Sequence, residues 1–254
     1  MSIDQYIKAY SPSSINSFLD YRARWYLEKV KKMKGVESVD MMRGKCVELG
    51  INRVYQGLSQ DEAISTALAD YDTMVAPLDI DEAADAKKPI AELIALGIET
   101  LKPYGALKGM QRKIWVEQDK VSGSHLPWVG YVDYDFEGDV IVDLKVAGRT
   151  PSGLSAGHAR QGSFYHKHTP ETKRTDFVYL IPLKAGCKTI TFTLQDADRH
   201  WNSMMAGMHT LQTIFSNITD PKLLDAVFTP STTDYWLNDD LSRNQAREVW
   251  ANLI

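Results

Sequence analysis

The sequence of 254 residues predicts an α/β (α+β) fold in which a mixed central sheet is flanked by helices. Helical spacing of apolar residues dominates residues 11 to about 103, strand patterns dominate 112–193, and helical spacing returns over 194–254. A helical stretch also interrupts the strands, which favours a crossover within the sheet. We therefore expect one domain over 1–254, with a helical part at 1–110, a sheet at 111–193 and C-terminal helices at 194–254.

The helical part begins with a clear start signal. Ser11 can cap a helix, Pro12 suits its first position, and apolar residues then recur at helical spacing as far as Met33. A second helix is expected over about 40–56. Two further helices, at about 60–76 and 81–102, are rich in alanine and acidic residues and look like a structural cap.

The sheet is expected to contain five strands, joined in part by a hairpin. The tripeptide from Glu137 to Asp139 is typical of a hairpin turn. The intervening helix is expected at about 154–168. The predicted strands are Lys113–Gln118, Trp128–Phe136, Val140–Val146, Asp176–Pro182 and Lys188–Leu194.

Composition excludes several classes of protein. With 44% hydrophobic and 24% charged residues the chain is not disordered, and no apolar run approaches the ~18 residues of a membrane span. The start of the sequence does not resemble a secretory signal, so the cytosol is the expected compartment. The net charge of −4 argues against a general nucleic-acid coat, although acidic residues at 61–99 account for much of it. Two cysteines, Cys46 and Cys187, are too few for a disulfide scaffold or a four-cysteine metal site.

The hairpin carries the strongest chemical signal. If the turn is 137–139, Phe136 pairs with Val140 and Asp133 falls opposite Asp143. Facing carboxylates repel each other unless something positive lies between them, and a divalent cation or Lys145 would serve. Carboxylates that hold Mg²⁺ or Mn²⁺ beside a lysine are what metal-assisted phosphodiester hydrolysis requires. The alternative is an ordinary cross-strand ion network.

A further carboxylate, Glu48, lies on an apolar stripe of the second helix, one turn after Gly44. Its side chain should therefore face the interior or a cleft, where ionisation is costly without a partner. The alternative is a buried glutamate paired with Arg43 or Arg53.

Gln161 and Tyr165 lie four residues apart on the helix that follows the hairpin, and both can hydrogen-bond a phosphate or a water. The alternative is a merely polar helix. A metal site built from the histidines of this helix is disfavoured, because His166 and His168 do not share a face.

Taken in order, the segments SPSSINSFLDY, RGKCVELG, GYVDYDFEGDVIVDLK and QGSFY resemble the RecB-like branch of the PD-(D/E)XK nuclease superfamily, which includes CRISPR-associated and phage RecB-like exonucleases. The resemblance covers residues 11 to 182 and implies a restriction-endonuclease-like core with an N-terminal helical cap. It also implies a catalytic set of Lys145, Asp133, Asp143, Glu48, Gln161 and Tyr165.

In that set, the resemblance makes Asp133, Asp143 and the backbone carbonyl of Leu144 ligands of Mg²⁺ or Mn²⁺. Glu48 would be a direct or water-bridged ligand, and Lys145 the catalytic lysine. The remaining pair, Gln161 and Tyr165, would orient the lysine and the scissile phosphate.

The sequence departs from the family pattern at several positions. Val132 stands where the eponymous proline would be, and Gly162 where the branch tends to have leucine. Tyr21 replaces the first cysteine of cluster-bearing relatives, and the segment TPSTTDYWLNDDL lacks the others, so no iron–sulfur cluster is expected. The C-terminal helices should then dock by packing alone, with three tryptophans as anchors: Trp201, Trp236 and Trp250.

These features together lead us to expect a DNA exonuclease in which a metal-activated water leaves 5′-phosphate and 3′-hydroxyl ends. The alternatives are a structure- or sequence-specific endonuclease of the same fold and a catalytically inactive nucleic-acid-binding protein. Expected partners are single- or double-stranded DNA ends, with a recombination or single-strand-binding protein as a further candidate in a bacterial or phage-infected cell. Tyr131, Tyr165 or Trp128 would stack on unpaired bases. Phosphates would be met by Arg22, Arg24, Lys29, Arg43, Arg149, Arg160 and Lys167, although the basic residues of the first helix are also typical of a solvated face.

Overall fold

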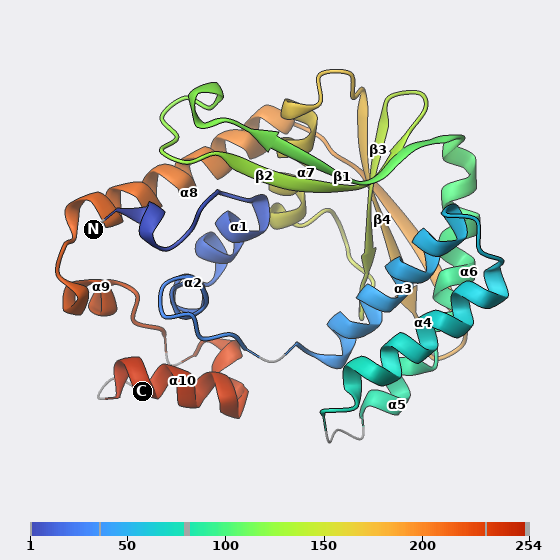
Figure 1. The fold of residues 1–254 in the computed structure, drawn as a ribbon, viewed down its shortest axis with the longest axis horizontal. Helices are drawn as coiled ribbons and strands as arrows, with labels where there is room; N and C mark the ends of the chain where they lie inside the picture. The colour runs from blue at the N-terminus through green and yellow to red at the C-terminus, as the bar shows by residue number, and fades with distance from the viewer. Residues whose placement is uncertain (1, 36, 79–81, 232, 252–254) are drawn as a thin grey trace.

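The structure, a computed structural model, describes residues 2–35, 37–78, 82–231 and 233–251. Its strands form one mixed sheet in the order β1–β2–β3–β4–β5 (Figure 1). Strands β3 and β4 are parallel and the other neighbours are antiparallel. This arrangement confirms the predicted mixed sheet with flanking helices and a helical N-terminal region. The strands are β1 (Leu107–Val116), β2 (Trp128–Phe136), β3 (Val140–Val146), β4 (Arg174–Pro182) and β5 (Cys187–Thr193).

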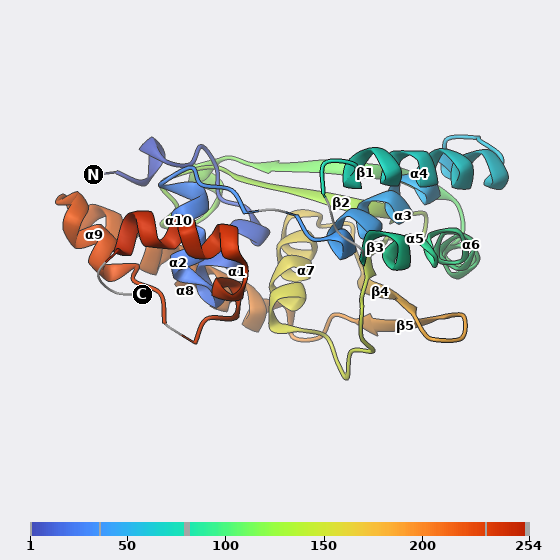
Figure 2. The same cartoon turned by 90° about the horizontal axis from the view of Figure 1, so that it is seen from below.

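The helices gather at the two ends of the molecule. Figures 1 and 2 both show α3 to α6 beside β3 and β4, whereas α2 and α8 to α10 lie at the opposite end. The α-helices are α1 (Pro12–Asp20), α2 (Arg22–Lys29), α3 (Val39–Tyr55), α4 (Gln60–Val75), α5 (Glu82–Lys87), α6 (Ile90–Leu101), α7 (Ala156–His168), α8 (Ala197–Asn217), α9 (Pro221–Val227) and α10 (Asp240–Trp250). Short 3₁₀ helices occur at η1 (Ile3–Gln5), η2 (Lys102–Tyr104), η3 (Gln118–Lys120) and η4 (Tyr235–Asn238).

Two hydrophobic clusters fix these helices against the sheet. One joins α1, α2, α7, α8 and α10 to β1 and β2, and the other joins α3, α4 and α6 to β2, β3 and β4. In the first cluster Trp201 packs on Trp128, with ring centroids 5.5 Å apart, and Trp250 packs on Tyr26 at 6.2 Å. The C-terminal tryptophans, Trp236 included, are buried, as the sequence predicts. No helix in the described ranges is long and apolar enough to cross a membrane.

The first predicted helix is wrong in its length. Ser11 caps α1 as expected, by accepting a hydrogen bond from Ser14 N, but the helix ends at Asp20 and α2 starts at Arg22. Tyr21, between them, has φ −147° and ψ 71°, outside the helical region. Its ring meets Tyr235 of the C-terminal segment, with centroids 5.2 Å apart. A long-range contact of this kind leaves no trace in the local spacing of apolar residues.

The helix predicted over 81–102 is also divided in two, since α5 ends before Pro89 and α6 begins after it. Residue 81 lies outside the described residues. Strands β2 and β3 match their predicted bounds, whereas β1 begins at Leu107, upstream of the predicted start at Lys113. The early part of β1 contains a register shift between Leu107 and Gly109 and a left-handed residue, Gln111, and both disturb the alternation that identifies strands.

Candidate active site

The predicted carboxylates meet where β2 and β3 separate. The paired register runs from Phe136–Val140 to Tyr134–Val142, as the hairpin pattern predicts. One residue further on, the side chain of Asp133 bonds to β3 where a backbone partner would otherwise stand. Its Oδ2 accepts a hydrogen bond from Leu144 N at 2.9 Å. This contact places the Asp133 carboxylate beside β3 at the position of Asp143.

Asp143 and Lys145 form an ion pair on β3. The Asp143 side chain is fully buried, and Lys145 Nζ lies 2.5 Å from its Oδ1. Apart from Lys145 and the Tyr165 hydroxyl, whose hydrogen bond acts to lower the pKa of Asp143, the described residues give its two buried oxygens no partner. Two fully buried carboxylate oxygens with so few donors are costly, so the site can accept a cation.

Glu48 reaches the same place from α3, the helix that begins after Ser38, whose side chain caps it. Its Oε1 accepts a hydrogen bond from Gln111 Nε2 at 2.5 Å, and the same nitrogen lies 3.5 Å from Asp133 Oδ1. The two carboxylate oxygens are therefore no further apart than the sum of these distances. Gln111 is the group that links Glu48 to Asp133.

The alternative in which Glu48 pairs with an arginine is wrong. Arg43 forms its ion pair with Asp40 at 2.7 Å, and Arg53 forms its pair with Asp70 at 2.5 Å. Glu48 instead bonds to Gln111 and lies close to the charges of Asp133 and Lys145.

Burial and like charges shift the ionisation of the whole cluster. Burial, followed by the charge of Asp133, raises the pKa of Glu48 to about 7. Burial and the charge of Asp143 likewise raise the pKa of Asp133 to about 7. Burial raises the pKa of Asp143 as well. Such a group of carboxylates favours uptake of a cation or of protons.

The same carboxylates favour the charged form of Lys145. Burial alone would lower the pKa of Lys145, but the neighbouring carboxylates of Asp143 and Asp133 outweigh this effect and raise its pKa. Lys145 is therefore held in its charged form beside Asp143, able to face a phosphate oxygen.

Gln161 and Tyr165 form a hydrogen-bonded chain that ends on β2. Gln161 Nε2 donates to Tyr165 OH at 2.6 Å, and Tyr165 OH donates to the carbonyl oxygen of Tyr131 at 2.6 Å. The chain holds the backbone of β2 two residues before Asp133. The structure thus brings both residues to the site, where they brace a strand.

A cavity of about 340 Å³ opens beside this chain. It is bounded by the N-terminal end of α1 at Ser11 and Ser13 and by Tyr131, Asp133 and Tyr165. Asp133, the member of the carboxylate cluster that lines this cavity, can therefore be approached from the side of α1 and β2.

The donors fit a hard divalent cation in their chemistry, because carboxylate oxygens are the ligands that Mg²⁺ and Mn²⁺ prefer. Their arrangement is not yet that of a metal site: no group of three His, Cys, Asp or Glu side chains in the part of the chain that the structure describes could hold a metal as it stands. The amide of Gln111 lies between two of the carboxylates. A cation bound by Glu48 and Asp133 would displace that amide.

The comparisons with known proteins add the fold. Neither a protein-family model nor a curated protein matches the sequence. Among solved structures, the chain is similar to a protein of Eubacterium rectale named "putative exonuclease", with a TM-score of 0.54 and 15% identity over 96% of this chain and 90% of that chain. The two proteins share the α+β fold. A second structure, of the protein SSO0001, has a TM-score of 0.37 and 13% identity over 72% of this chain and 81% of that chain.

The basic residues predicted to contact DNA do not form one track. Arg160 is buried, donates to Asn16 at 2.6 Å and pairs with Asp20 at 3.0 Å. Arg43 is buried as well. Arg160 joins α7 to α1, whereas Arg43 pairs with Asp40 within α3, and because both are buried we no longer expect them to contact DNA.

The other predicted cations are spread over several surfaces. Arg22 lies 5.3 Å from the ring centroid of Phe18, and Arg24 pairs with Glu28 at 3.0 Å. Lys29 lines a separate hollow with Arg24. Arg149 is exposed in the loop after β3, the loop that leaves the site. Of these four residues, Arg149 is the one placed next to the lysine strand.

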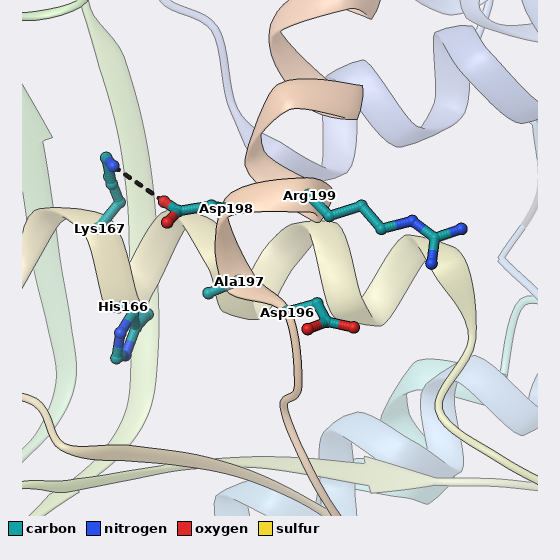
Figure 3. A pocket seen from close by; sticks show the side chains of 6 residues that line it. All are labelled: His166, Lys167, Asp196, Ala197, Asp198 and Arg199. Atoms are coloured by element: carbon teal, nitrogen blue, oxygen red, sulfur yellow. Dashed lines mark hydrogen bonds and ion pairs between the residues drawn. The ribbon is translucent and has the colours of Figure 1, made fainter.

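Lys167 faces a different hollow, of about 790 Å³, at the start of α8. Figure 3 shows its ammonium pointing at Asp198, 3.1 Å from the Oδ1 atom, while Arg199 points away from this pair. Asp196 lies in the same hollow, so its charges are mixed. None of the clustered carboxylates lines it.

Sequence reasoning missed two groups that border the site. Gln111 lies upstream of the predicted strand, and its left-handed backbone, with φ 48°, gives no sequence signal. Tyr179 of β4 is paired with Lys145 in the parallel register, and its hydroxyl lies 2.5 Å from His158 Nδ1 of α7. Only the non-local pairing of β3 with β4 brings Tyr179, and with it His158, to Lys145.

Proposed function

We propose that this protein is a divalent-metal-dependent nuclease that hydrolyses DNA phosphodiester bonds, acting from ends as an exonuclease. The observation that carries the proposal is the convergence of Glu48, Asp133 and Asp143 with Lys145 where β2 and β3 separate. Carboxylates from two strands and a helix, crowded enough to raise one another's pKa, are what a cation-dependent phosphoryl site needs.

Each residue has a distinct task in this proposal. A bound Mg²⁺ or Mn²⁺ would supply Lewis-acid activation of the phosphodiester. Asp133, fixed by Leu144 N, and Asp143, fully buried, present their oxygens from neighbouring strands. Lys145 keeps its charge next to them and can stabilise the charge that develops on the phosphate.

The preference for DNA ends comes from two likenesses. The RecB-like sequence segments and the name of the E. rectale protein both favour an exonuclease. One observation favours the inactive DNA-binding alternative instead: Gln111 occupies the space between Glu48 and Asp133, and no described trio of ligands is ready for a metal. The two possibilities differ in whether a cation displaces the Gln111 amide.

Digestion of end-labelled single- and double-stranded DNA with Mg²⁺, Mn²⁺ or EDTA tests the proposal. We expect metal-dependent shortening from an end, no nicking of closed circular DNA, and loss of cleavage in Asp143→Asn, a variant close in shape to the native side chain. Nicking of the circle would replace the exonuclease with an endonuclease. Failure of any DNA to be cut, while Mn²⁺ binding is absent by calorimetry, would leave a DNA-binding protein without catalysis.

A further inference from the structure

Strands β1 and β2 carry a row of side chains that leads away from the carboxylate cluster. Side chains alternate between the two faces of a strand, so Asp133, Tyr131 and Val129 share one face of β2. In the antiparallel register Lys113 of β1 lies opposite Tyr131, and Trp115 lies opposite Val129. The face that holds Asp133 therefore continues along the ribbon as a strip of Tyr131, Lys113 and Trp115.

The two aromatic residues of this strip are unusually exposed for their size. Tyr131 is 51% exposed and Trp115 is 46% exposed, whereas the other five tryptophans are buried. Helices α1, α7 and α8 lie on one side of the ribbon (Figure 2), and the neighbours Ile114 and Val132 are buried on that side. Single exposed aromatic side chains are common on protein surfaces, but a group of them on one face is typical of a binding surface.

Lys113 supplies the charge in this strip. Its Nζ lies 4.8 Å from the ring centroid of Trp115, a cation–π contact. The indole nitrogen of Trp115 donates to Glu117 Oε1 at 2.8 Å, which holds the ring by its edge. With one lysine and one glutamate, the strip has little net charge, so its affinity for a ligand must come mainly from the two rings.

We propose that this strip binds single-stranded DNA, with bases stacked on Tyr131 and Trp115 and a phosphate held by Lys113. This inference rests on the proposed nuclease function, because it gives the substrate of the same site. Aromatic faces stack on unpaired bases of any sequence, whereas a duplex hides those faces.

The strip is continuous with the candidate site. Tyr131 lines the cavity that also contains Asp133 and Tyr165. Same-face neighbours on a strand are about 7 Å apart, and facing residues on paired strands about 5 Å apart, so the path from Asp133 to Trp115 has no gap. A strand stacked on Tyr131 and Trp115 would therefore present its backbone to the carboxylates and Lys145.

Tryptophan fluorescence gives a direct test, because Trp115 is the one exposed tryptophan of the six. We expect an oligodeoxythymidylate, added in EDTA so that cleavage cannot occur, to quench the emission of the wild-type protein. Trp115→Phe should lose this quenching while still binding a fluorescein-labelled oligonucleotide in an anisotropy assay. A quench that persists in Trp115→Phe would overturn the placement of bases on Trp115.

Affinities from the same anisotropy assay test the rings and the charge separately. Trp115→Ala and Tyr131→Ala should each raise the Kd for the single strand by about tenfold. Lys113→Gln should make the salt dependence shallower, by about 0.7 in the slope of log K against log salt. Tyr235→Ala, which removes an exposed tyrosine from η4, is the matched control and should bind as the wild type does. Equal affinities for all four proteins would overturn the proposal.

Hydrolysis of a small diester separates this inference from the nuclease proposal. With Mn²⁺, bis(p-nitrophenyl) phosphate is too short to reach Trp115, so Trp115→Ala should cleave it at the wild-type rate and Asp143→Asn should not. If the wild type cleaves no diester but still binds single strands through Tyr131 and Trp115, the strip stands and the nuclease proposal fails. If DNA cleavage is normal in both aromatic variants and a duplex binds as tightly as a single strand, the strip fails and the nuclease proposal stands.

Discussion

Gln111 donates a hydrogen bond from Nε2 to Glu48 Oε1 at 2.5 Å, and so a neutral amide lies where two carboxylates, Glu48 and Asp133, face each other. The backbone of Gln111 adopts φ 48°, a left-handed conformation that is uncommon for residues other than glycine and carries strain. Strain of this kind persists when the surroundings impose it. The amide stabilises the carboxylates in the absence of a cation.

We predict that Gln111→Ala binds Mn²⁺ about fivefold more tightly than the wild type. Removal of the amide raises the free energy of the metal-free protein by about 1 kcal/mol, the contribution of one hydrogen bond, and leaves the cation-bound form unchanged. Isothermal titration with Mn²⁺ measures the effect. Lys108→Ala, on the same strand but paired with Asp139, is the control. Weaker binding in Gln111→Ala would show that the Gln111 carbonyl is itself a ligand.

The Asp143–Lys145 pair makes a prediction for stability in the metal-free protein. Asp143 is fully buried, and Lys145 is the cation paired with it. Lys145→Met, measured in EDTA by urea denaturation, should lower the free energy of unfolding by about 3 kcal/mol, because it leaves a buried charge without a partner. Adding Asp143→Asn should recover most of that loss. A Lys145→Met protein as stable as the wild type would show that the pair is not holding a charge on Asp143.

The sequence predictions are accurate where local interactions set the structure, and they fail where contacts between distant parts of the sequence set it. The bounds of β2 and β3 and the Phe136–Val140 register are set by local alternation and by the turn at Gly138, so they could be predicted. The position of Gln111 could not be predicted, because a register shift and its own left-handed backbone disturb the strand pattern at the start of β1. Arg160 was expected to meet DNA, but its partner Asp20 lies on a helix far away in the sequence, and only the tertiary structure shows that pair.

Gly162 of α7 lies directly against a buried ring of the sheet. A Cβ atom at Gly162 would lie 2.7 Å from Cε2 of Phe177, so α7 packs directly on that ring of β4. Gly162→Ala should lower the free energy of unfolding by about 1–3 kcal/mol, and Gly162→Leu by more, since overpacking forces the neighbours to move. Urea denaturation measures both. Gly153→Ala, where a Cβ meets nothing within 4 Å, is the control.

A second substitution tests the cause of that effect. Phe177→Leu removes ring atoms that the new methyl group would strike, so Gly162→Ala should cost less in a Phe177→Leu background than in the wild type. If Gly162→Ala lowers the free energy of unfolding equally in the two backgrounds, the destabilisation arises within the helix rather than from its contact with the ring.

His168 predicts how stability changes with pH. Its ring packs between Phe164 and Trp201, at centroid distances of 4.9 and 5.1 Å, and its buried Nε2 has no hydrogen-bond partner among the described residues. Burial, aided by the charge of Lys167, lowers the pKa of His168 to about 4, below the ordinary value of about 6.5. Between these values His168 binds more protons in the unfolded chain than in the folded protein, so the contribution of His168 to stability is lost as the pH falls through this range.

Urea denaturation of the metal-free protein between about pH 7 and about pH 4.5 checks this direction. We expect His168→Phe, which keeps an aromatic ring between the same neighbours, to gain stability relative to the wild type as the pH falls, because only the wild type must protonate His168. The raised pKa values of Glu48 and Asp133 act in the opposite direction, but they do so equally in both proteins. His158, whose pKa burial also lowers to about 4, contributes in the same direction as His168 and is unchanged in this variant. His166→Gln, on the same helix, controls for the loss of a histidine. If His168→Phe and His166→Gln show the same pH dependence as the wild type, His168 takes up its proton without a cost to the folded protein, and its pKa is not lowered there.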